Sequence, residues 1–393
     1  MRKIRYTQSM ENTYSLFLVV IPGLEQLAYD ELILKSNFFD TNYKTSRIVH
    51  GGIEIETTNI RDIAFFHLYL KIPTRILLRI SHFRAKDFPK LFKNLLKVDW
   101  AEYIPWVIPN LQFSSSESKL FDERKILKTL HDSINGQIKA QQPKEKYKDL
   151  KWSELPTVYI RNEDDNITVS IDLTGERMDR RGKKLFTTKA PMRESIASAM
   201  IQLTINSVES SQIETATIFD PMAGSGTIIF EASEYFSENK RHFNFLEMPF
   251  FFKGQPSVKF LAKNTLPKFR QFIANDIDSE AIAALKKNLE NYEGIQVNVF
   301  QSDFLASELQ FPKSEKLFIL TNPPYNKRIK TDLAMKDFLN LLYQQALTYR
   351  VDQISIITPM ENHSPKMDGY SKKEYLNILN GGLRTKFINH RLN

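Results

Sequence analysis

Residues Asn322-Pro323-Pro324-Tyr325 follow the apolar run 318–321, and their types and order suit chemistry on an amino group. An amino group on an aromatic base is a poor nucleophile, because its lone pair is delocalised into the ring. Two hydrogen-bond acceptors can pull the nitrogen toward a tetrahedral geometry, and the Asn322 side chain and the Pro323 carbonyl can supply them. The prolines hold these acceptors rigidly, and Tyr325 can stack on an extruded base. The ordinary alternative is a strand that ends in a Pro-Pro turn.

A glycine-containing loop, Asp220-Pro-Met-Ala-Gly-Ser-Gly-Thr227, stands between an expected strand at 216–220 and an expected helix at 227–236. Glycines let a ligand approach the backbone, and the start of a helix offers free amides that suit a carboxylate. Gly224 and Gly226 also suit an ordinary strand-to-helix turn, and they do not form the longer dinucleotide fingerprint. Asp220 would repel a pyrophosphate but can hold an ammonium group. An amino-acid-like group therefore fits this loop better than a nucleotide phosphate.

Two more acidic residues follow expected strands at 271–276 and 296–300. Asp276 is placed to accept hydrogen bonds from ribose hydroxyls, as acidic residues do at this position in nucleoside-binding sheets. Asp303 can accept from an adenine amino group, and Phe304 can pack on the ring. Each acid alone is more often a helix cap or a turn former. Together with Asp220 they outline a ligand with an amino acid at one end and adenosine at the other, which is S-adenosylmethionine.

The elements that must position these residues change character along the chain. From residue 187 onward, strands alternate with helices, which predicts an α/β domain with a mostly parallel sheet. The N-terminal half instead predicts a small α+β unit, with a strand at 14–20, a helix at 24–34 and a second strand at 48–56. No residue pattern between 1 and 185 indicates catalysis.

The composition excludes some kinds of site and favours a charged partner. The 393 residues contain no cysteine, which excludes disulfides and thiolate metal sites, and the histidines show no metal-ligand spacing. No run approaches the length of a membrane span, and the N-terminus lacks the apolar core of a signal peptide. We therefore expect a cytoplasmic protein without a metal or a membrane partner. The formal net charge of +8 favours a polyanionic partner.

Basic residues are concentrated just before the α/β domain, where five cations fall within the eight residues 177–184. This run is either a solvated connector between domains or a strip that contacts phosphates. A second basic group follows the Asn-Pro-Pro-Tyr tip. The candidate phosphate-contacting residues are Arg177, Arg180, Arg181, Lys183, Lys184, Lys327 and Arg328.

The order of these motifs resembles the class I S-adenosylmethionine-dependent amino-methyltransferases. More narrowly, it resembles the THUMP-domain ribosomal RNA (guanine-N(2))-methyltransferases that act on large-subunit RNA. Residues 189–195, 241–250 and 379–386 are similar to the entry helix, the insert and the last hairpin of that family. The resemblance covers residues 155–393 and is fainter over 1–150. Ala223 stands where the family often has Cys, and we expect the chain to lack the second methyltransferase module that is fused to some relatives.

The resemblance implies a fold and a domain order. A Rossmann-like class I methyltransferase sheet would occupy the C-terminus, preceded by α+β ferredoxin-like and THUMP domains. The expected units are a ferredoxin-like unit at 1–65, a THUMP RNA-binding domain at 66–175, a basic linker at 176–190 and the methyltransferase domain at 191–393.

The resemblance also assigns site residues. Asn322, Pro323, Pro324 and Tyr325 would act on the target amine. The residues expected around S-adenosylmethionine are Asp220, Met222, Ala223, Gly224, Gly226, Thr227, Asp276, Ile277, Asp303 and Phe304. The implied reaction is methylation of the exocyclic amino group of a guanine in RNA, with large-subunit ribosomal RNA as the expected substrate.

Three other functions use the same tip or the same fold. One is methylation of adenine N(6) in DNA, and another is methylation of a glutamine side chain on a protein. The third is a non-catalytic RNA-binding scaffold that keeps the methyltransferase fold. The preference for guanine over adenine rests on the resemblance alone, because no residue in the sequence can be identified as reading the base.

Overall fold

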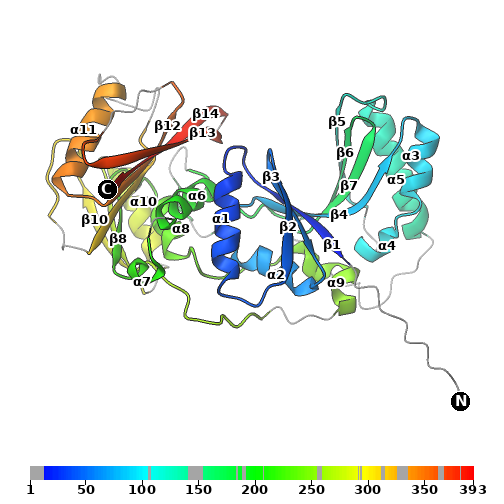
Figure 1. The fold of residues 1–393 in the computed structure, drawn as a ribbon, viewed down its shortest axis with the longest axis horizontal. Helices are drawn as coiled ribbons and strands as arrows, with labels where there is room; N and C mark the ends of the chain where they lie inside the picture. The colour runs from blue at the N-terminus through cyan, green and yellow to red at the C-terminus, as the bar shows by residue number, and fades with distance from the viewer. Residues whose placement is uncertain are drawn as a thin grey trace, which may run out of the picture.

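The computed structural model describes residues 13–104, 108–139, 154–182, 185–187, 192–206, 208–254, 259–290, 292, 294–310, 315–324, 335–361, 367–380 and 382–393. In these residues the chain forms two seven-stranded sheets. The sheets lie along the long axis of an elongated molecule, with helices α1, α6 and α8 between them (Figure 1).

The first sheet has the strand order β2-β3-β1-β4-β7-β6-β5. Its strands are β1 (Tyr14–Val19), β2 (Tyr43–Val49), β3 (Gly52–Thr57), β4 (Arg75–Arg84), β5 (Asn110–Ser116), β6 (Thr157–Glu163) and β7 (Asn166–Asp172). All neighbours are antiparallel except β5 and β6, which are parallel. Strand β4 pairs with both β1 and β7, so the sheet is continuous across the expected boundary at residue 65. The domain boundaries themselves stay predictions.

The helices of this half are α1 (Glu25–Ser36), α2 (Ile60–Tyr69), α3 (Phe88–Leu95), α4 (Trp100–Tyr103) and α5 (Glu123–Lys139). The single strand predicted at 48–56 is wrong. Gly51, with φ of +83°, turns the chain there, so β2 and β3 form a hairpin. Strand β5 was not predicted, because its sequence Asn-Leu-Gln-Phe-Ser-Ser-Ser is largely polar. Leu111 and Phe113 are half-buried, and its other residues are exposed.

The second sheet has the order β10-β9-β8-β11-β12-β14-β13. Its strands are β8 (Ala216–Asp220), β9 (Gln271–Asp276), β10 (Gln296–Gln301), β11 (Lys316–Thr321), β12 (Gln353–Pro359), β13 (Tyr370–Asn380) and β14 (Leu383–Leu392). The first five are parallel, and β14 runs antiparallel to both β12 and β13. This confirms the predicted α/β class. The strand order reverses beside β8, where ligands bind in open sheets of this kind.

The helices of this half are α6 (Glu194–Ile205), α7 (Ser210–Ile213), α8 (Thr227–Ser233), η2 (Asn244–Glu247), α9 (Pro249–Gly254), α10 (Ser279–Leu289) and α11 (Met335–Thr348). The segment that holds η2 and α9 leaves the α/β sheet and packs on the N-terminal half. Phe243 and Phe245 lie against the buried ring of His67, with centroids 5.0 and 4.5 Å away, and Phe250 lies 6.1 Å from Tyr14. One apolar cluster therefore spans both halves of the molecule.

Candidate active site

The candidate site lies at the carboxyl edge of the second sheet. Strand β11 pairs in parallel with β8, with Ile319 opposite Phe219, and β8 pairs in parallel with β9. Because the carboxyl ends of parallel strands meet at one edge, Asn322, Asp220 and Asp276 gather there. The structure thus brings together the residues that the sequence placed at three separate strand ends.

The glycine loop after β8 has a backbone that glycine alone adopts readily. Gly226 has φ of +92°, and a Cβ at this position would lie 2.5 Å from Leu285 Cδ1 and 2.8 Å from the Phe230 ring. Gly224 has φ of +54°, and its amide donates a 2.8 Å hydrogen bond to Asp276 Oδ2. The loop therefore packs tightly against Leu285 and Phe230, and it is hydrogen-bonded to the end of β9 at Asp276.

Asn275 is a positioning residue to which the sequence analysis assigned no role. Its Nδ2 donates to the carbonyls of Pro221 at 3.1 Å and Ser302 at 3.0 Å. Its Oδ1 accepts from Ser302 Oγ at 2.9 Å, and its carbonyl accepts from Ala223 N at 2.8 Å. One buried amide therefore holds the ends of β8, β9 and β10 in register. The signal in the sequence was a polar residue at the end of the apolar strand Phe-Ile-Ala-Asn-Asp.

The two carboxylates differ in their surroundings. Asp220 is 2% exposed and accepts a 3.1 Å hydrogen bond from Met222 N. Burial raises the pKa of Asp220 to about 7, and the nearby Asp276 carboxylate adds a smaller effect in the same direction. Asp276 is half-buried and accepts from the amides of Gly224 and Asp278 at 2.8 and 3.0 Å. Burial also raises the pKa of Asp276.

The tip after β11 carries the candidate acceptors. The buried Oδ1 of Asn322 has no hydrogen-bond partner among the residues that the structure describes. Leaving such an acceptor unsatisfied costs about 1–3 kcal/mol, so a buried oxygen of this kind suits a ligand's N–H group. Pro323 is buried and Pro324 half-buried. Tyr325 lies outside the described residues.

The part of the site that is expected to hold the adenine ring lies after β9 and β10, and it contains one exposed and one buried apolar side chain. Ile277, next to Asp276, is 67% exposed, and Asp303 is exposed. Phe304 is 3% exposed and packs edge-on against Phe219 at 5.3 Å between centroids. The exposed apolar surface here therefore comes from Ile277. The assignment of Phe304 to the ring stays a prediction.

The basic run before the domain divides into exposed and buried arginines. Arg180 is exposed, whereas Arg177 donates two hydrogen bonds to Asp179 at 2.8 and 2.7 Å. Arg181 is 6% exposed and forms a 2.5 Å ion pair with Glu231. The guanidinium of Arg181 is thus buried against a carboxylate, which argues against a phosphate contact, and its assignment to phosphate stays a prediction. The other expected phosphate contacts, which lie outside the described residues, are Lys183, Lys184, Lys327 and Arg328.

The described part of the chain contains neither a metal-ligand cluster nor a membrane-spanning helix. There, no group of three or more His, Asp or Glu side chains is arranged to hold a metal ion. None of the helices described is both long and apolar enough to cross a membrane.

A family model described as "RMKL-like, methyltransferase domain" matches residues 181–369. Over 408 aligned residues, the chain is 22% identical to the ribosomal RNA large subunit methyltransferase K/L of Marinomonas sp. strain MWYL1, and the alignment covers 98% of this chain and 53% of that protein. The chain spans about half the length of the curated relatives that it matches.

Solved structures share the fold over nearly the whole chain. A possible methylase from Clostridium difficile 630 has a TM-score of 0.72 at 24% identity, covering 97% of this chain and 99% of that one. SMU.472, solved as a complex with SAH, has a TM-score of 0.71 at 22% identity, covering 98% of this chain and 99% of that one. With the family match, these similarities make the C-terminal α/β sheet a Rossmann-like methyltransferase fold. Residues 181–369 are therefore similar to the RMKL-like methyltransferase domain family, whose model matches them.

Proposed function

We propose that this chain transfers a methyl group from S-adenosylmethionine to the exocyclic amino group of a guanine in RNA, with large-subunit ribosomal RNA as substrate. The observation that carries the proposal is the buried Oδ1 of Asn322, which has no hydrogen-bond partner among the described residues and lies at the sheet edge where Asp220 and Asp276 also lie. The RNA substrate draws on the name of the Marinomonas relative. The choice of guanine draws on the family resemblance.

We propose that residues at the sheet edge hold S-adenosylmethionine from its methionine end to its adenine end. Asp220, a buried carboxylate, would hold the ammonium of the methionine part, and Asp276 would accept from the ribose hydroxyls. Ile277, exposed beside Asp276, offers an apolar face to the adenine, and Asp303 offers an acceptor. When bound, S-adenosylmethionine supplies a methyl carbon that is electrophilic because it is attached to a sulfonium. The loop residues Met222, Ala223, Gly224, Gly226 and Thr227 would surround the methionine part.

The tip would prepare the target amine. Asn322 Oδ1 and the Pro323 carbonyl would accept its two N–H groups, which would localise the nitrogen lone pair so that it can attack. Pro324 would hold the turn, and Tyr325 would stack on the base. Positioning of the amine supplies most of the catalysis in this scheme, and its proton is lost to water after transfer.

The rest of the proposal concerns RNA and the N-terminal half. We assign the ferredoxin-like unit to residues 1–65, the THUMP RNA-binding domain to 66–175, the linker to 176–190 and the catalytic domain to 191–393. The exposed Arg180 supports a phosphate-contacting role for the linker. The proposal places the reaction in the cytoplasm.

The test of this function is methyl transfer with a defined readout. Purified protein and labelled S-adenosylmethionine are incubated with bulk RNA, DNA and protein from a strain that lacks this chain, and the products are digested and analysed by mass spectrometry. We expect label in N(2)-methylguanosine of large-subunit RNA. Label in N(6)-methyladenine of DNA or in glutamine of a protein would replace the proposal. No label in any substrate, with cofactor binding intact, would indicate a scaffold.

A second prediction concerns the linker. The triple change Arg180→Gln, Lys183→Gln and Lys184→Gln should weaken RNA binding and lower the slope of log K against log salt by up to about 3, since each phosphate contact adds about 0.7–0.9. The charge-preserving control Arg180→Lys, Lys183→Arg and Lys184→Arg should keep the slope. Titrations of fluorescent RNA at several salt concentrations measure both, and an unchanged slope in the glutamine variant would remove the linker from the RNA interface.

A further inference from the structure

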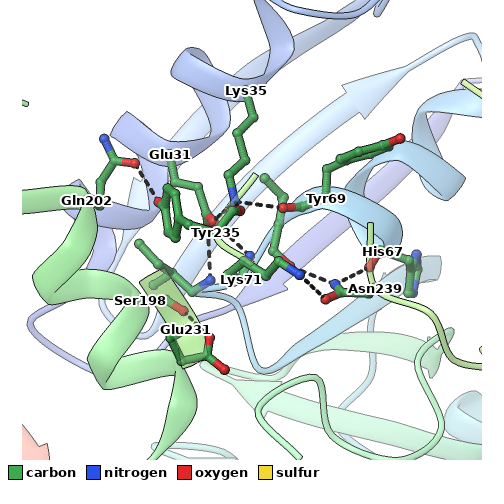
Figure 2. A network of polar contacts seen from close by, with 12 residues as sticks. Glu31, Lys35, His67, Tyr69, Lys71, Ser198, Gln202, Glu231, Tyr235 and Asn239 are labelled. Atoms are coloured by element: carbon green, nitrogen blue, oxygen red, sulfur yellow. Dashed lines mark hydrogen bonds and ion pairs between the residues drawn. The ribbon is translucent and has the colours of Figure 1, made fainter. Parts of the chain in front are cut away.

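A buried polar network joins the N-terminal half to the methyltransferase domain (Figure 2). At its centre is Lys35 of α1, which is 1% exposed. Its Nζ donates to Glu31 Oε1 at 2.6 Å and to the carbonyls of Tyr69 at 2.8 Å and Tyr235 at 2.7 Å. The first two partners belong to the N-terminal half, and Tyr235 follows α8 of the catalytic domain. One ammonium group therefore bonds to both halves of the molecule.

A second bridge runs beside the first. Nζ of the buried Lys71 donates to Asn239 Oδ1 at 2.5 Å. Asn239 Nδ2 donates to the carbonyls of His67 at 2.8 Å and Leu70 at 3.1 Å, and its backbone amide donates to the Leu68 carbonyl at 2.7 Å. The segment after α8 is thus bonded, through side chains and backbone, to the last turn of α2 and to the residues that follow it.

Helix α8 connects this polar network to the loop 220–226, which bears candidate cofactor residues. Glu231 of α8 accepts from Arg181 of the linker at 2.5 Å and from Ser198 of α6 at 2.8 Å, and Arg181 also donates to the Lys71 carbonyl at 2.6 Å. Helix α8 begins directly after Gly226 and has seven residues, so it spans about 10 Å at 1.5 Å per residue. The network therefore lies one short helix away from the loop that bears the candidate cofactor residues.

A gain in stability is a weak explanation for the buried charge of Lys35. Burial lowers the pKa of Lys35 to about 8, although the Glu31 carboxylate beside it acts in the opposite direction. Buried ion pairs are often no more stabilising than apolar side chains of the same volume, because both charges lose their water. An ion pair with directed hydrogen bonds instead favours one relative position of the groups that it joins. Glu31 extends this geometry, since it also accepts from the amides of Lys71 at 2.8 Å and Ile72 at 2.9 Å.

Domains joined by an ordinary polar interface are expected to move relative to one another. The contact between the two halves, which we call the joint, is instead held by buried and directed hydrogen bonds from Lys35, Lys71 and Asn239. We propose that Lys35 and Asn239 are positioning residues that hold the N-terminal half at a fixed distance from Asn322, so that RNA bound there presents one nucleotide to the site. The inference rests on the proposed function. The strands β5 to β7 lie at the end of the molecule far from the catalytic sheet (Figure 1), so a small rotation at the joint displaces them widely.

The main variant is Lys35→Met, which removes the ammonium group and keeps an unbranched side chain. Glu31 keeps its two backbone donors, so its carboxylate is not left without partners. We expect methyl groups to spread from one guanine to several in the large-subunit RNA. We also expect kcat/KM on that RNA to fall by about tenfold, because a displacement of about 1 Å can cost up to about 100-fold. A short oligonucleotide with the same guanine, and cofactor binding, should change less than about twofold.

The matched control is Lys263→Met, which removes another lysine ammonium group that lies between the two halves. Lys263 Nζ lies 3.9 Å from Asp40 Oδ1, but the Lys263 side chain is 54% exposed. This control should keep the methyl on one guanine. Asn239→Ala is a second test variant with the same expected result as Lys35→Met, in case one of the two fails to fold.

The position of the two halves is measured independently of activity. The chain has no cysteine, so cysteines introduced at Phe121 and Leu392, both exposed, can each carry one spin label. The two labels report the distance between the residues just before α5 and the end of β14. We expect a narrow distance distribution in the parent and a broad one in Lys35→Met. Across the same joint, Asn206 Nδ2 donates to Asp30 Oδ2 at 2.7 Å. A short thiol cross-link between cysteines at these two positions should restore the single methylated guanine.

The outcomes separate this inference from the proposed function. A broad distribution in the parent, or an equally narrow one in Lys35→Met, overturns the fixed joint. A broadened distribution with the methyl still on one guanine overturns the role in target selection. If the parent protein methylates no RNA, the proposed function fails and the claim of target selection fails with it, whereas the distances still decide whether Lys35 fixes the joint.

Discussion

Replacing Asn322 by alanine should lower the rate of methyl transfer by about 10³-fold while cofactor affinity stays within about twofold. The reason is that Asn322 Oδ1 is a buried acceptor without a partner among the described residues, and it is proposed to act on the amine only. Removing one preorganised polar group from an active site typically costs about 10²–10³ in rate. Single-turnover transfer of labelled methyl to RNA measures the rate, and calorimetric titration of S-adenosylmethionine measures the affinity.

Two controls make the Asn322 result specific. Asn322→Asp keeps an acceptor oxygen at the same place and should keep more activity than Asn322→Ala. Asn298 is exposed on the edge strand β10, so Asn298→Ala should leave the rate unchanged. If Asn322→Ala transferred methyl groups at a rate within fivefold of the parent, the tip would have no catalytic role and the proposed mechanism would be wrong.

Acidification should weaken the binding of S-adenosylmethionine through Asp220. Burial raises the pKa of this carboxyl to about 7, so the ligand-free protein holds a proton there at pH 6. An ammonium group and that proton compete for the same carboxylate. The apparent dissociation constant should therefore rise about tenfold for each pH unit below 7, because protonation must be reversed before the ammonium binds. Titrations between pH 5 and 8 measure this slope.

The variant Asp220→Asn identifies the group responsible. It should bind S-adenosylmethionine more weakly than the parent at pH 8 and should lose most of the pH dependence between 5 and 7. Affinity that is independent of pH in the parent would show that Asp220 does not hold the ammonium.

Acidification should raise the contribution of Asp220 to the stability of the ligand-free protein, although it weakens cofactor binding. Burial raises the pKa of Asp220 to about 7 in the folded chain, against an ordinary value of 3.8 for an aspartate carboxyl. Between these values the native state binds a proton that the unfolded state does not, so this group's contribution to the free energy of unfolding falls as the pH rises from about 4 to 7. Burial shifts the pKa of Asp276 in the same direction. Thermal denaturation of the parent and of Asp220→Asn at pH 5 and 8 would separate the share of Asp220.

Local patterns were sufficient for several features. An apolar strand, a glycine loop and a helix are encoded by neighbouring residues, so the β8-loop-α8 unit and the alternation that follows it were predicted from the sequence. The parallel order of these units was also sufficient to place Asp220, Asp276 and Asn322 at one edge. Where the local pattern was ambiguous the prediction failed. The run 48–56 alternates like one strand, but Gly51 divides it into β2 and β3.

The α/β class and the order of the motifs could be predicted from the amino-acid sequence, because each depends on residues close together in the chain. Which charged residues face solvent, and which join the two halves, depends instead on tertiary packing. Arg181 looked like its basic neighbours, yet it pairs with Glu231, 50 positions later. Lys35 bonds to the carbonyl of Tyr235, 200 positions away. Contacts at such separations depend on how the two halves pack, and no local periodicity records that packing.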